Sequence, residues 1–332
     1  MIDDLMHPSA FPETTKKITL AQTHISNVFI GDKFVYKIKK PVNFGFLDFS
    51  TLEKRKYYCN QEVELNSRFS QDVYLGVYPV TFDGTKHAIN GKGEVVDYAV
   101  KMRRLSDEDL LKSRLKKDTV TSNDIKRIAE AIAAFHKRAK RSKEIDAFGK
   151  IDAVRLNTDE NFQQTAEFVG DSISKKQYEA LKKWTDEFYK KHQELFAQRI
   201  KNGNIRNCHG DLHMEHICLT DPIIIFDCIE FNDRFRYIDT ASDIAFLLMD
   251  LEFNGAKTLS EQLHEIYLSY IDEKDDDLTI QLINFYKLYR AYVRGKVTSF
   301  ILNDAAVPED KKIEARATAQ RYFALAHSYI SK

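Results

Sequence analysis

The pattern of hydrophobic and polar residues changes part-way along the chain. The first hundred residues contain short strand-like runs separated by turn residues such as Gly31-Asp32 and Asp83-Gly84. The runs lie at residues 17–22, 27–30, 33–39, 74–80 and 95–102. A helical pattern at residues 51–69 interrupts them. This part of the chain therefore predicts a small β-rich unit with one helix.

From Ser106 onward the apolar residues recur at intervals of three and four, which is typical of helices that bury one face. Thr121 with Asp124, and Ser174 with Gln177, have the spacing of capping boxes at two helix starts. Helices are predicted at residues 121–138, 174–200, 260–271, 276–302 and 309–330. The remainder of the chain is therefore expected to be mainly helical.

One segment, residues 207–230, carries the most specific chemistry. Asp211 lies in a loop rich in glycine and histidine, where the backbone turns sharply. Asp227 follows sixteen positions later, directly after an apolar run. The predicted order is a loop, a strand at 217–220, a turn at Asp221-Pro222, a buried strand at 223–226 and then the second acid.

This arrangement resembles the catalytic core of the aminoglycoside phosphotransferase and choline kinase branch of the protein-kinase-like superfamily. The resemblance covers nearly the whole chain, and its specific part is residues 208–230. It implies an α+β, bilobal protein-kinase-like fold. The β-rich N-lobe, with the nucleotide-binding sheet and one helix, is expected at residues 1–103, and the mainly helical C-lobe at 104–332.

The resemblance also implies roles for the loop and the second acid. Asp211 is expected to be the catalytic base that orients the attacking hydroxyl, with His209 and His213 beside it in the same loop. Asp227 is expected to hold Mg²⁺ on the phosphates of ATP. Phosphoryl transfer needs both, because its catalysis is mostly positioning and neutralisation of charge on the phosphate oxygens.

His216 departs from the family pattern, because the resembled enzymes usually have an asparagine there that binds a second metal. Imidazole is a poor ligand for Mg²⁺ and a better one for manganese or zinc. Three interpretations stay open. His216 replaces the asparagine as a metal or phosphate contact, the site uses one Mg²⁺, or the enzyme is impaired.

The nucleotide-binding residues of the N-lobe are assigned from the same resemblance. Lys37 matches the phosphate-binding lysine of the third strand, and Lys39, on the same face, is the alternative. Lysines on a solvent-facing strand edge are a further alternative. Glu62 is expected to pair with the strand lysine, Ser26 to donate to phosphate from a glycine-free loop, and Met102 to lie near the adenine base.

Charged residues after Asp227 fall where the family places groups next to the substrate or the metal. They are Glu230, Asn232, Arg234 and Arg236. Arg290 and Arg294 lie on an otherwise apolar helix face, and a buried arginine needs an anionic partner, either an acid of the protein or an acidic or phosphorylated substrate. Asp239 and Asp243 are expected to satisfy backbone amides at a helix start and to tie down the catalytic loop.

Composition and short motifs argue against several classes of protein. The 50 basic and 50 acidic residues balance, so there is no global attraction to nucleic acid or anionic membrane. No apolar run approaches the length of a membrane span, and the N-terminal residues lack an apolar signal core, so a cytoplasmic protein is expected. The four cysteines include no CxxC pair, and no P-loop motif is present. Zinc held by the cysteines and histidines around the active loop is an alternative that matches no standard spacing.

Two functions follow from these observations. The first is an ATP-dependent phosphotransferase that moves the γ-phosphate to a hydroxyl of a small molecule, with Mg²⁺, or Mn²⁺, as the metal. The second is a nucleotide-binding pseudokinase or scaffold without turnover, suggested by the glycine-free loop and His216. Both bind a nucleotide, and only the first turns it over in the presence of an acceptor.

Overall fold

The computed structural model describes residues 1–271, 273 and 276–331 of the chain. The chain forms two compact units, each of which is built from two stretches of sequence. The first unit contains residues 1–118 and 215–233, and the second contains residues 119–214 and 234–332. Relative to the predicted lobes, residues 104–118 and 215–233 group with the β-rich part of the chain.

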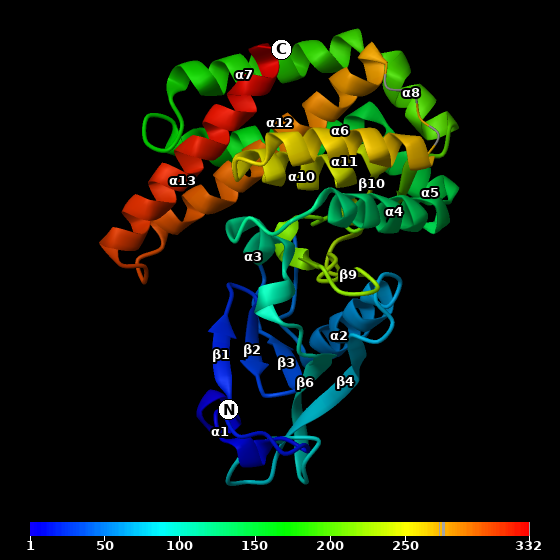
Figure 1. Ribbon diagram of the computed structural model, residues 1–332. Coiled ribbons are helices and arrows are strands. Elements are labelled where there is room, and N and C mark those ends of the chain that lie inside the picture. The colour runs from blue at the N-terminus through cyan, green and yellow to red at the C-terminus, as the bar shows by residue number, and fades with distance from the viewer. Residues whose placement is uncertain (272, 274–275, 332) are drawn as a thin grey trace. The chain divides into compact units, whose positions relative to one another are not determined.

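The first unit is built on a six-stranded antiparallel sheet (Figure 1). Its strands, in the order β1-β2-β3-β6-β4-β5, are β1 (Thr19–Gln22), β2 (Ser26–Ile30), β3 (Phe34–Lys39), β6 (Glu94–Arg103), β4 (Tyr74–Phe82) and β5 (His87–Ile89). Helix α2 (Leu52–Asn66) packs against β4 and β6. The short elements are α1 (Ile2–Leu5), α3 (Leu111–Lys116) and the β8–β9 hairpin (Ile217–Cys218 and Ile224–Ile225). The five predicted strands are confirmed, and β5 is an additional short strand.

Strand β3 separates an apolar face from a charged face. Tyr36 and Ile38 are buried in a core cluster with Phe29 of β2 and Val80 of β4. Because side chains alternate along a strand, the residues between and after them point to the opposite face. That face carries two lysines of β3 and faces α2.

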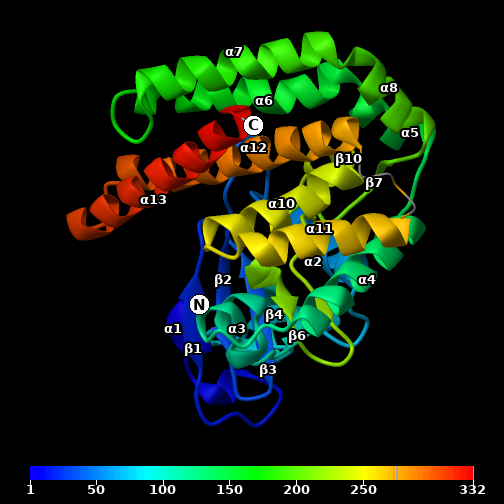
Figure 2. The ribbon, with the colours of Figure 1, turned by 45° about the horizontal axis from the view of Figure 1, so that its top comes forward.

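The second unit is mainly helical (Figure 2). Its helices are α4 (Ser122–Arg138), α5 (Lys143–Asp146), α6 (Ile151–Thr165), α7 (Lys175–Lys191), α8 (Gln193–Lys201), α10 (Thr240–Phe253), α11 (Lys257–Ile271), α12 (Asp277–Phe300) and α13 (Glu309–Ser328). Strands β7 (Ile205–Asn207) and β10 (Tyr237–Asp239) form an antiparallel pair, and the short α9 (Asp233–Arg236) crosses the boundary in sequence. Helix α10 is almost wholly buried and packs against α11 and α12, while α12 packs against α13. This β-rich unit and this helical unit confirm the predicted α+β class.

Two features of the helical unit differ from the sequence prediction. The helix expected to run from Ser174 to Ile200 breaks at His192, whose backbone leaves the helical region at φ −114° and ψ 29°. The His192 ring packs on Phe188 with a centroid separation of 4.3 Å. Helix α6 was not predicted, because its buried face includes polar residues such as Thr158 and Asn161 that mask the apolar period.

The capping box of Thr121 and Asp124 at the start of α4 is confirmed, as is the one at Ser174 and Gln177. Within the described ranges, no helix combines the length and the apolar character that crossing a membrane requires.

Candidate active site

Two lysines and three carboxylates of the first unit form one charged network. Lys37 Nζ donates to Asp227 Oδ1 at 2.7 Å and pairs with Glu62 Oε1 at 2.9 Å. Lys39 Nζ donates to the other oxygen of the same carboxylate, Glu62 Oε2, at 2.6 Å and also to Glu230. The structure therefore brings together Lys37, Glu62 and Asp227, and it adds Lys39 and Glu230 to them.

Burial divides this network into an inner and an outer part. The side chains of Lys39 and Glu62 are 1% and 0% exposed, whereas those of Lys37 and Asp227 are 13% and 38% exposed. Burial alone would lower the pKa of a lysine, but the neighbouring carboxylates hold the pKa of Lys37 and of Lys39 above the usual value. Burial would raise the pKa of Glu62, and the two lysines instead lower it. Both lysines are therefore charged, and the Asp227 end of the network is the accessible one.

The backbone around Asp227 is held in an unusual conformation by groups from α2, β4 and the turn between them. Asp227 has a φ of +60°, a left-handed value that is uncommon for a residue other than glycine. The Tyr74 hydroxyl accepts from the Asp227 amide at 3.0 Å, and the Asn66 side chain accepts from the Cys228 amide at 2.8 Å. The Ser70 hydroxyl donates to the Ile225 carbonyl at 3.0 Å. These contacts hold the backbone on both sides of the Asp227 side chain, and no local sequence signal indicates them.

His216 lies against the same carboxylate. Its Nε2 is 3.5 Å from Asp227 Oδ2, and its carbonyl accepts from the Phe226 amide at 3.1 Å across the β8–β9 hairpin. The donor set on this side of Asp227 is thus one partly exposed carboxylate and one imidazole. A carboxylate can bind either Mg²⁺ or Mn²⁺, and the imidazole favours Mn²⁺ over Mg²⁺.

The remaining predicted nucleotide residues have other surroundings. Ser26 is fully buried in β2, and its hydroxyl has no hydrogen-bond partner among the described residues. In the turn before it, the Thr23 hydroxyl accepts from the amides of Ile25 and Ser26, at 3.3 and 3.0 Å. Met102 lies in β6 and packs against the apolar cluster around Tyr74. Two amides of this glycine-free turn are therefore already engaged within the turn.

In the second unit, the loop that contains Asp211 is held at both of its ends by acids of α10. Asp243 accepts from the amides of His209, at 3.0 Å, and Gly210, at 2.9 Å. Asp250, seven residues and two helical turns further on, accepts from the Met214 amide at 3.0 Å. As predicted, Asp243 ties down the loop that contains Asp211, and Asp239 caps α10 by accepting from the Ala241 amide at 2.9 Å. Asp250 was not predicted, although a buried acid on the apolar face of a helix is a signal for such an anchor.

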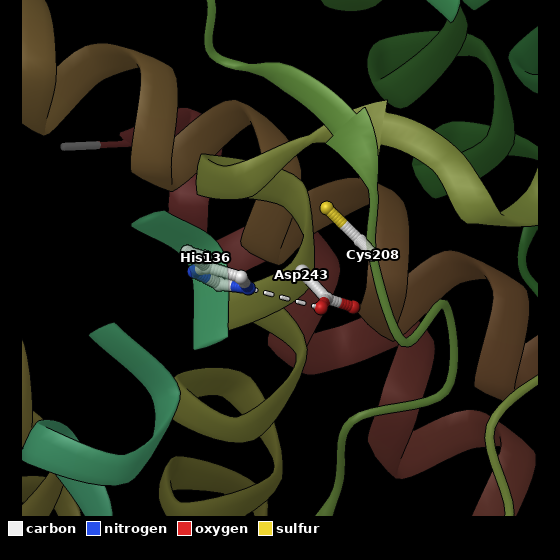
Figure 3. Close-up of side chains that lie close together, drawn as sticks. All are labelled: His136, Cys208 and Asp243. Atoms are coloured by element: carbon white, nitrogen blue, oxygen red, sulfur yellow. Dashed lines mark hydrogen bonds and ion pairs between the residues drawn. The ribbon is translucent and has the colours of Figure 1, made fainter. Parts of the chain in front are cut away.

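Asp243 also lies in a buried cluster with His136 and Cys208 (Figure 3). His136 Nε2 is 3.1 Å from Asp243 Oδ2, and its Nδ1 is 2.7 Å from the Tyr267 hydroxyl. Burial would raise the pKa of the Asp243 carboxyl, but the hydrogen bonds from His136 and the loop amides lower it to about 2. Because both ring nitrogens and the carboxylate already have protein partners, the cluster fits a hydrogen-bonded core better than a zinc site.

Asp211 itself is partly exposed. Its side chain is 34% exposed, its amide donates to His209 Nδ1 at 3.2 Å, and its Oδ2 is 3.5 Å from His213 Nε2. The His213 ring packs against Phe246 of α10. The carboxylate is therefore both fixed by its loop and accessible to a small molecule.

The predicted substrate residues mostly have partners within the protein. Arg234 binds Glu160 through two hydrogen bonds of 2.9 and 2.6 Å, and buried Arg236 donates to Asn207 Oδ1 at 2.7 Å. Asn232 donates to the Phe46 carbonyl at 2.9 Å in the first unit.

The two arginines of α12 have different environments. Arg290 donates to the carbonyls of Gly210, at 2.9 Å, and Ser242, at 3.1 Å, so its partners are backbone groups and it is a further anchor of the loop that contains Asp211. The Arg294 guanidinium lies 5.7 Å from the ring centroid of Tyr322. Burial opposes its charge, whereas Tyr322 and the carboxylates of Asp211 and Asp250 raise its pKa.

A family model described as the phosphotransferase enzyme family matches residues 62–277, which is more than half of the chain. The chain belongs to this phosphotransferase family. Curated relatives of this chain include uncharacterised proteins of Mycobacterium tuberculosis and Mycobacterium bovis, each 34% identical over 315 residues. The match covers 94% of this chain and 60% of each relative, so the chain spans about 60% of the length of these proteins.

Solved structures similar to this chain include an aminoglycoside phosphotransferase, a choline kinase and an amicoumacin kinase. A mutant of aminoglycoside 2'-phosphotransferase-IIIa with GDP has a TM-score of 0.57 and 14% identity, covering 94% of this chain and 93% of that one. Choline kinase from Cryptosporidium parvum has a TM-score of 0.55 and 13% identity, covering 95% and 90%. Amicoumacin kinase with AMP-PNP and Ca²⁺ has a TM-score of 0.55 and 12% identity, covering 96% and 89%. At these identities the likeness concerns the fold, and it confirms the predicted protein-kinase-like fold.

Proposed function

We propose that this chain is an ATP-dependent phosphotransferase that transfers the γ-phosphate to a hydroxyl group of a small molecule. The observation that carries the proposal is the position of Lys37, which contacts both Glu62 and Asp227. These three residues come from β3, α2 and the segment after β9, and each was selected from the sequence for a separate role at the nucleotide phosphates. Their meeting at one ammonium group is what a phosphate and metal site requires.

In this proposal, Asp227 and Lys37 receive the phosphate end of the nucleotide. The Asp227 carboxylate would hold Mg²⁺, or Mn²⁺, which supplies positive charge to the phosphate oxygens. Lys37 would turn from Asp227 toward those oxygens while Glu62 keeps its ammonium group oriented. His216, 3.5 Å from the same carboxylate, would serve as a further metal or phosphate contact in place of the family's asparagine.

Asp211 would act on the acceptor. A carboxylate that accepts a hydrogen bond from the acceptor hydroxyl orients the oxygen for attack and takes its proton as the bond to phosphorus forms. The anchors at Asp243, Asp250 and Arg290 support this role, because they hold the backbone on both sides of Asp211. Rigid support of this kind is what a positioned base needs.

A second candidate function, a nucleotide-binding pseudokinase or scaffold, is favoured by the turn at residues 23–26. Two of its amides are engaged by Thr23, and the Ser26 hydroxyl is buried, so the turn offers few donors to a phosphate. The histidine at position 216, where the family usually has a metal-binding asparagine, also favours this candidate. This candidate predicts nucleotide binding without phosphoryl transfer.

The two candidates are separated by measuring nucleotide binding and nucleotide consumption in the same preparation. ATP and GTP are each tested with Mg²⁺ and with Mn²⁺, against a panel of aminoglycosides, choline, ethanolamine and other amino alcohols. We expect nucleoside diphosphate release that depends on one class of acceptor. Binding without release for every acceptor would favour the pseudokinase, and absence of nucleotide binding would contradict both candidates.

A further inference from the structure

The charged network of the first unit contains one more buried ion pair than its proposed phosphate contacts require. Lys37, Glu62 and Asp227 account for the lysine, its partner and the metal ligand. Lys39 and Glu230 lie deeper, with side chains that are 1% and 5% exposed. Burying two charges costs several kcal/mol per ion unless the pair has good geometry and further hydrogen bonds, so a pair at this place calls for an explanation.

Lys39 has little access to a ligand. Its ammonium group donates to Glu62 and to Glu230, and the Phe49 ring lies over it at 4.8 Å from the centroid. Lys37, two residues earlier on the same strand face, is the more exposed of the two. Lys39 is therefore poorly placed to contact a phosphate.

Glu62 connects the two lysines. One of its oxygens pairs with Lys37 and the other accepts from Lys39. A carboxylate held at one oxygen can rotate about that contact, whereas a carboxylate held at both cannot. Lys39 thus fixes the oxygen that faces Lys37, and Glu230 compensates the charge of Lys39.

We propose that Lys39, together with Glu230, is a positioning residue of the nucleotide site that acts through Glu62 on Lys37. This inference rests on the proposed function, since it assigns the direct nucleotide contact to Lys37. The pair orders Glu62 before the nucleotide arrives, so that binding does not have to supply the free energy of ordering it. The consequence is that loss of Lys39 weakens the nucleotide contact made by Lys37 without removing a contact of its own.

The test uses a paired substitution that leaves the charge of the network unchanged. Lys39→Met with Glu230→Met removes one positive and one negative charge and replaces both side chains with apolar ones of similar size. Such replacements of buried ion pairs are often neutral for stability or stabilising, so the variant is expected to fold. The matched control is Arg55→Met with Asp97→Met, which removes another buried ion pair that joins α2 to β6, with an Nε–Oδ1 distance of 2.8 Å.

Affinity for ATP with Mg²⁺ is measured by calorimetry for the parent and both paired variants, and thermal unfolding verifies their folding. We expect the Lys39/Glu230 variant to bind about tenfold more weakly, the lower end of the loss typical when a group that orients a ligand-binding residue is removed. The control is expected to stay within about twofold of the parent, since it leaves Glu62 and both lysines intact.

A double-mutant cycle then tests whether the loss of ATP affinity in the Lys39/Glu230 variant depends on Lys37. Lys37→Met is combined with the Lys39/Glu230 substitutions, and the loss from the pair is compared in the two backgrounds. Positioning through Lys37 predicts that the tenfold loss disappears once Lys37 is methionine. An equal loss in both backgrounds would assign Lys39 a contact of its own, and an unchanged affinity in the parent background would leave the pair without a role in binding; either result overturns the inference. A parent that binds no nucleotide, or a Lys37→Met variant with parental affinity, would instead contradict the proposed function.

Discussion

Replacement of Asp243 by asparagine should destabilise the protein and slow phosphoryl transfer together. Asp243 is fully buried and accepts from three donors, namely His136 Nε2 and the amides of His209 and Gly210. An asparagine side chain offers one acceptor oxygen, and its nitrogen donates. At least one of the three donors would then face another donor in a fully buried site.

The magnitude follows from the hydrogen bonds that the substitution removes. Hydrogen bonds to a charged group contribute about 1.5–3 kcal/mol each, and a buried donor left unpaired costs a similar amount, so we expect the free energy of unfolding to fall by about 3 kcal/mol. For a protein of this size, the midpoint of thermal unfolding should fall by roughly 4 °C. Because two of the donors belong to the loop that carries Asp211, kcat should fall as well, while affinity for the nucleotide should stay close to that of the parent.

Glu252→Gln provides the matched control for this variant. Glu252 lies on the same helix with a side chain that is only 7% exposed, but its side-chain partners are Lys287, Ser260 and the Tyr329 hydroxyl, the last at 2.6 Å, and all three lie outside the loop that contains Asp211. The control should lose stability with kcat unchanged. The reasoning is refuted if Asp243→Asn unfolds within about 1 kcal/mol of the parent, or if its kcat falls no further than that of the control.

Three further outcomes are expected. The pKa of Asp243 is about 2 in the folded protein, below the ordinary 3.8, and this difference contributes about 2 kcal/mol of stability above pH 3.8 that is lost as the pH falls toward 2. The difference in unfolding free energy between the parent and Asp243→Asn, measured by denaturant titration, should therefore shrink over that pH range. A constant difference would contradict the expectation. Asp227→Ala should weaken ATP binding in the presence of Mg²⁺ and leave metal-free binding nearly unchanged, and equal metal dependence in calorimetry would reject its role as metal ligand. His216→Asn should shift the metal preference of turnover from Mn²⁺ toward Mg²⁺, whereas an unchanged ratio of the two rates would reject a metal role for His216.

The elements of the fold that could be predicted are those whose signal is local. Short strand-like runs bounded by turn residues located β1 to β4 and β6, and capping boxes located the starts of α4 and α7. Helix α6 was missed because it buries Thr158 and Asn161, and the break at His192 was missed because nothing in the flanking sequence interrupts the helical pattern. In both cases tertiary packing overrides the local pattern.

The same distinction applies to the candidate site. Lys37, Glu62 and Asp227 were assigned from the family resemblance, and they do meet in the structure. The groups that orient Asp227 were not found, because Tyr74 and Asn66 contact residues more than 150 positions further along the chain. Sequence alone offers no means of matching such partners without an alignment.

The partners of the arginines near the site could not be identified from the sequence either. The family resemblance places Arg234 and Arg236 among the groups next to the substrate or the metal, yet Glu160 and Asn207 are partners of these arginines in the folded chain. Arg290 binds backbone carbonyls, a partner that sequence-based reasoning about anions does not anticipate. A charged residue in a functional segment therefore indicates a need for a partner without identifying it.

The central claim is tested most directly by replacing Asp211 with asparagine and measuring phosphoryl transfer and nucleotide affinity on the same purified protein. The acceptor is the compound that supports the fastest nucleotide consumption in the panel described above. Because a general base contributes typically about 10²–10⁴-fold, we expect kcat to fall by at least about 100-fold while the Kd for ATP with Mg²⁺ stays within about twofold of the parent. Parental kcat in the folded Asp211→Asn variant would contradict the assignment of Asp211 as the catalytic base.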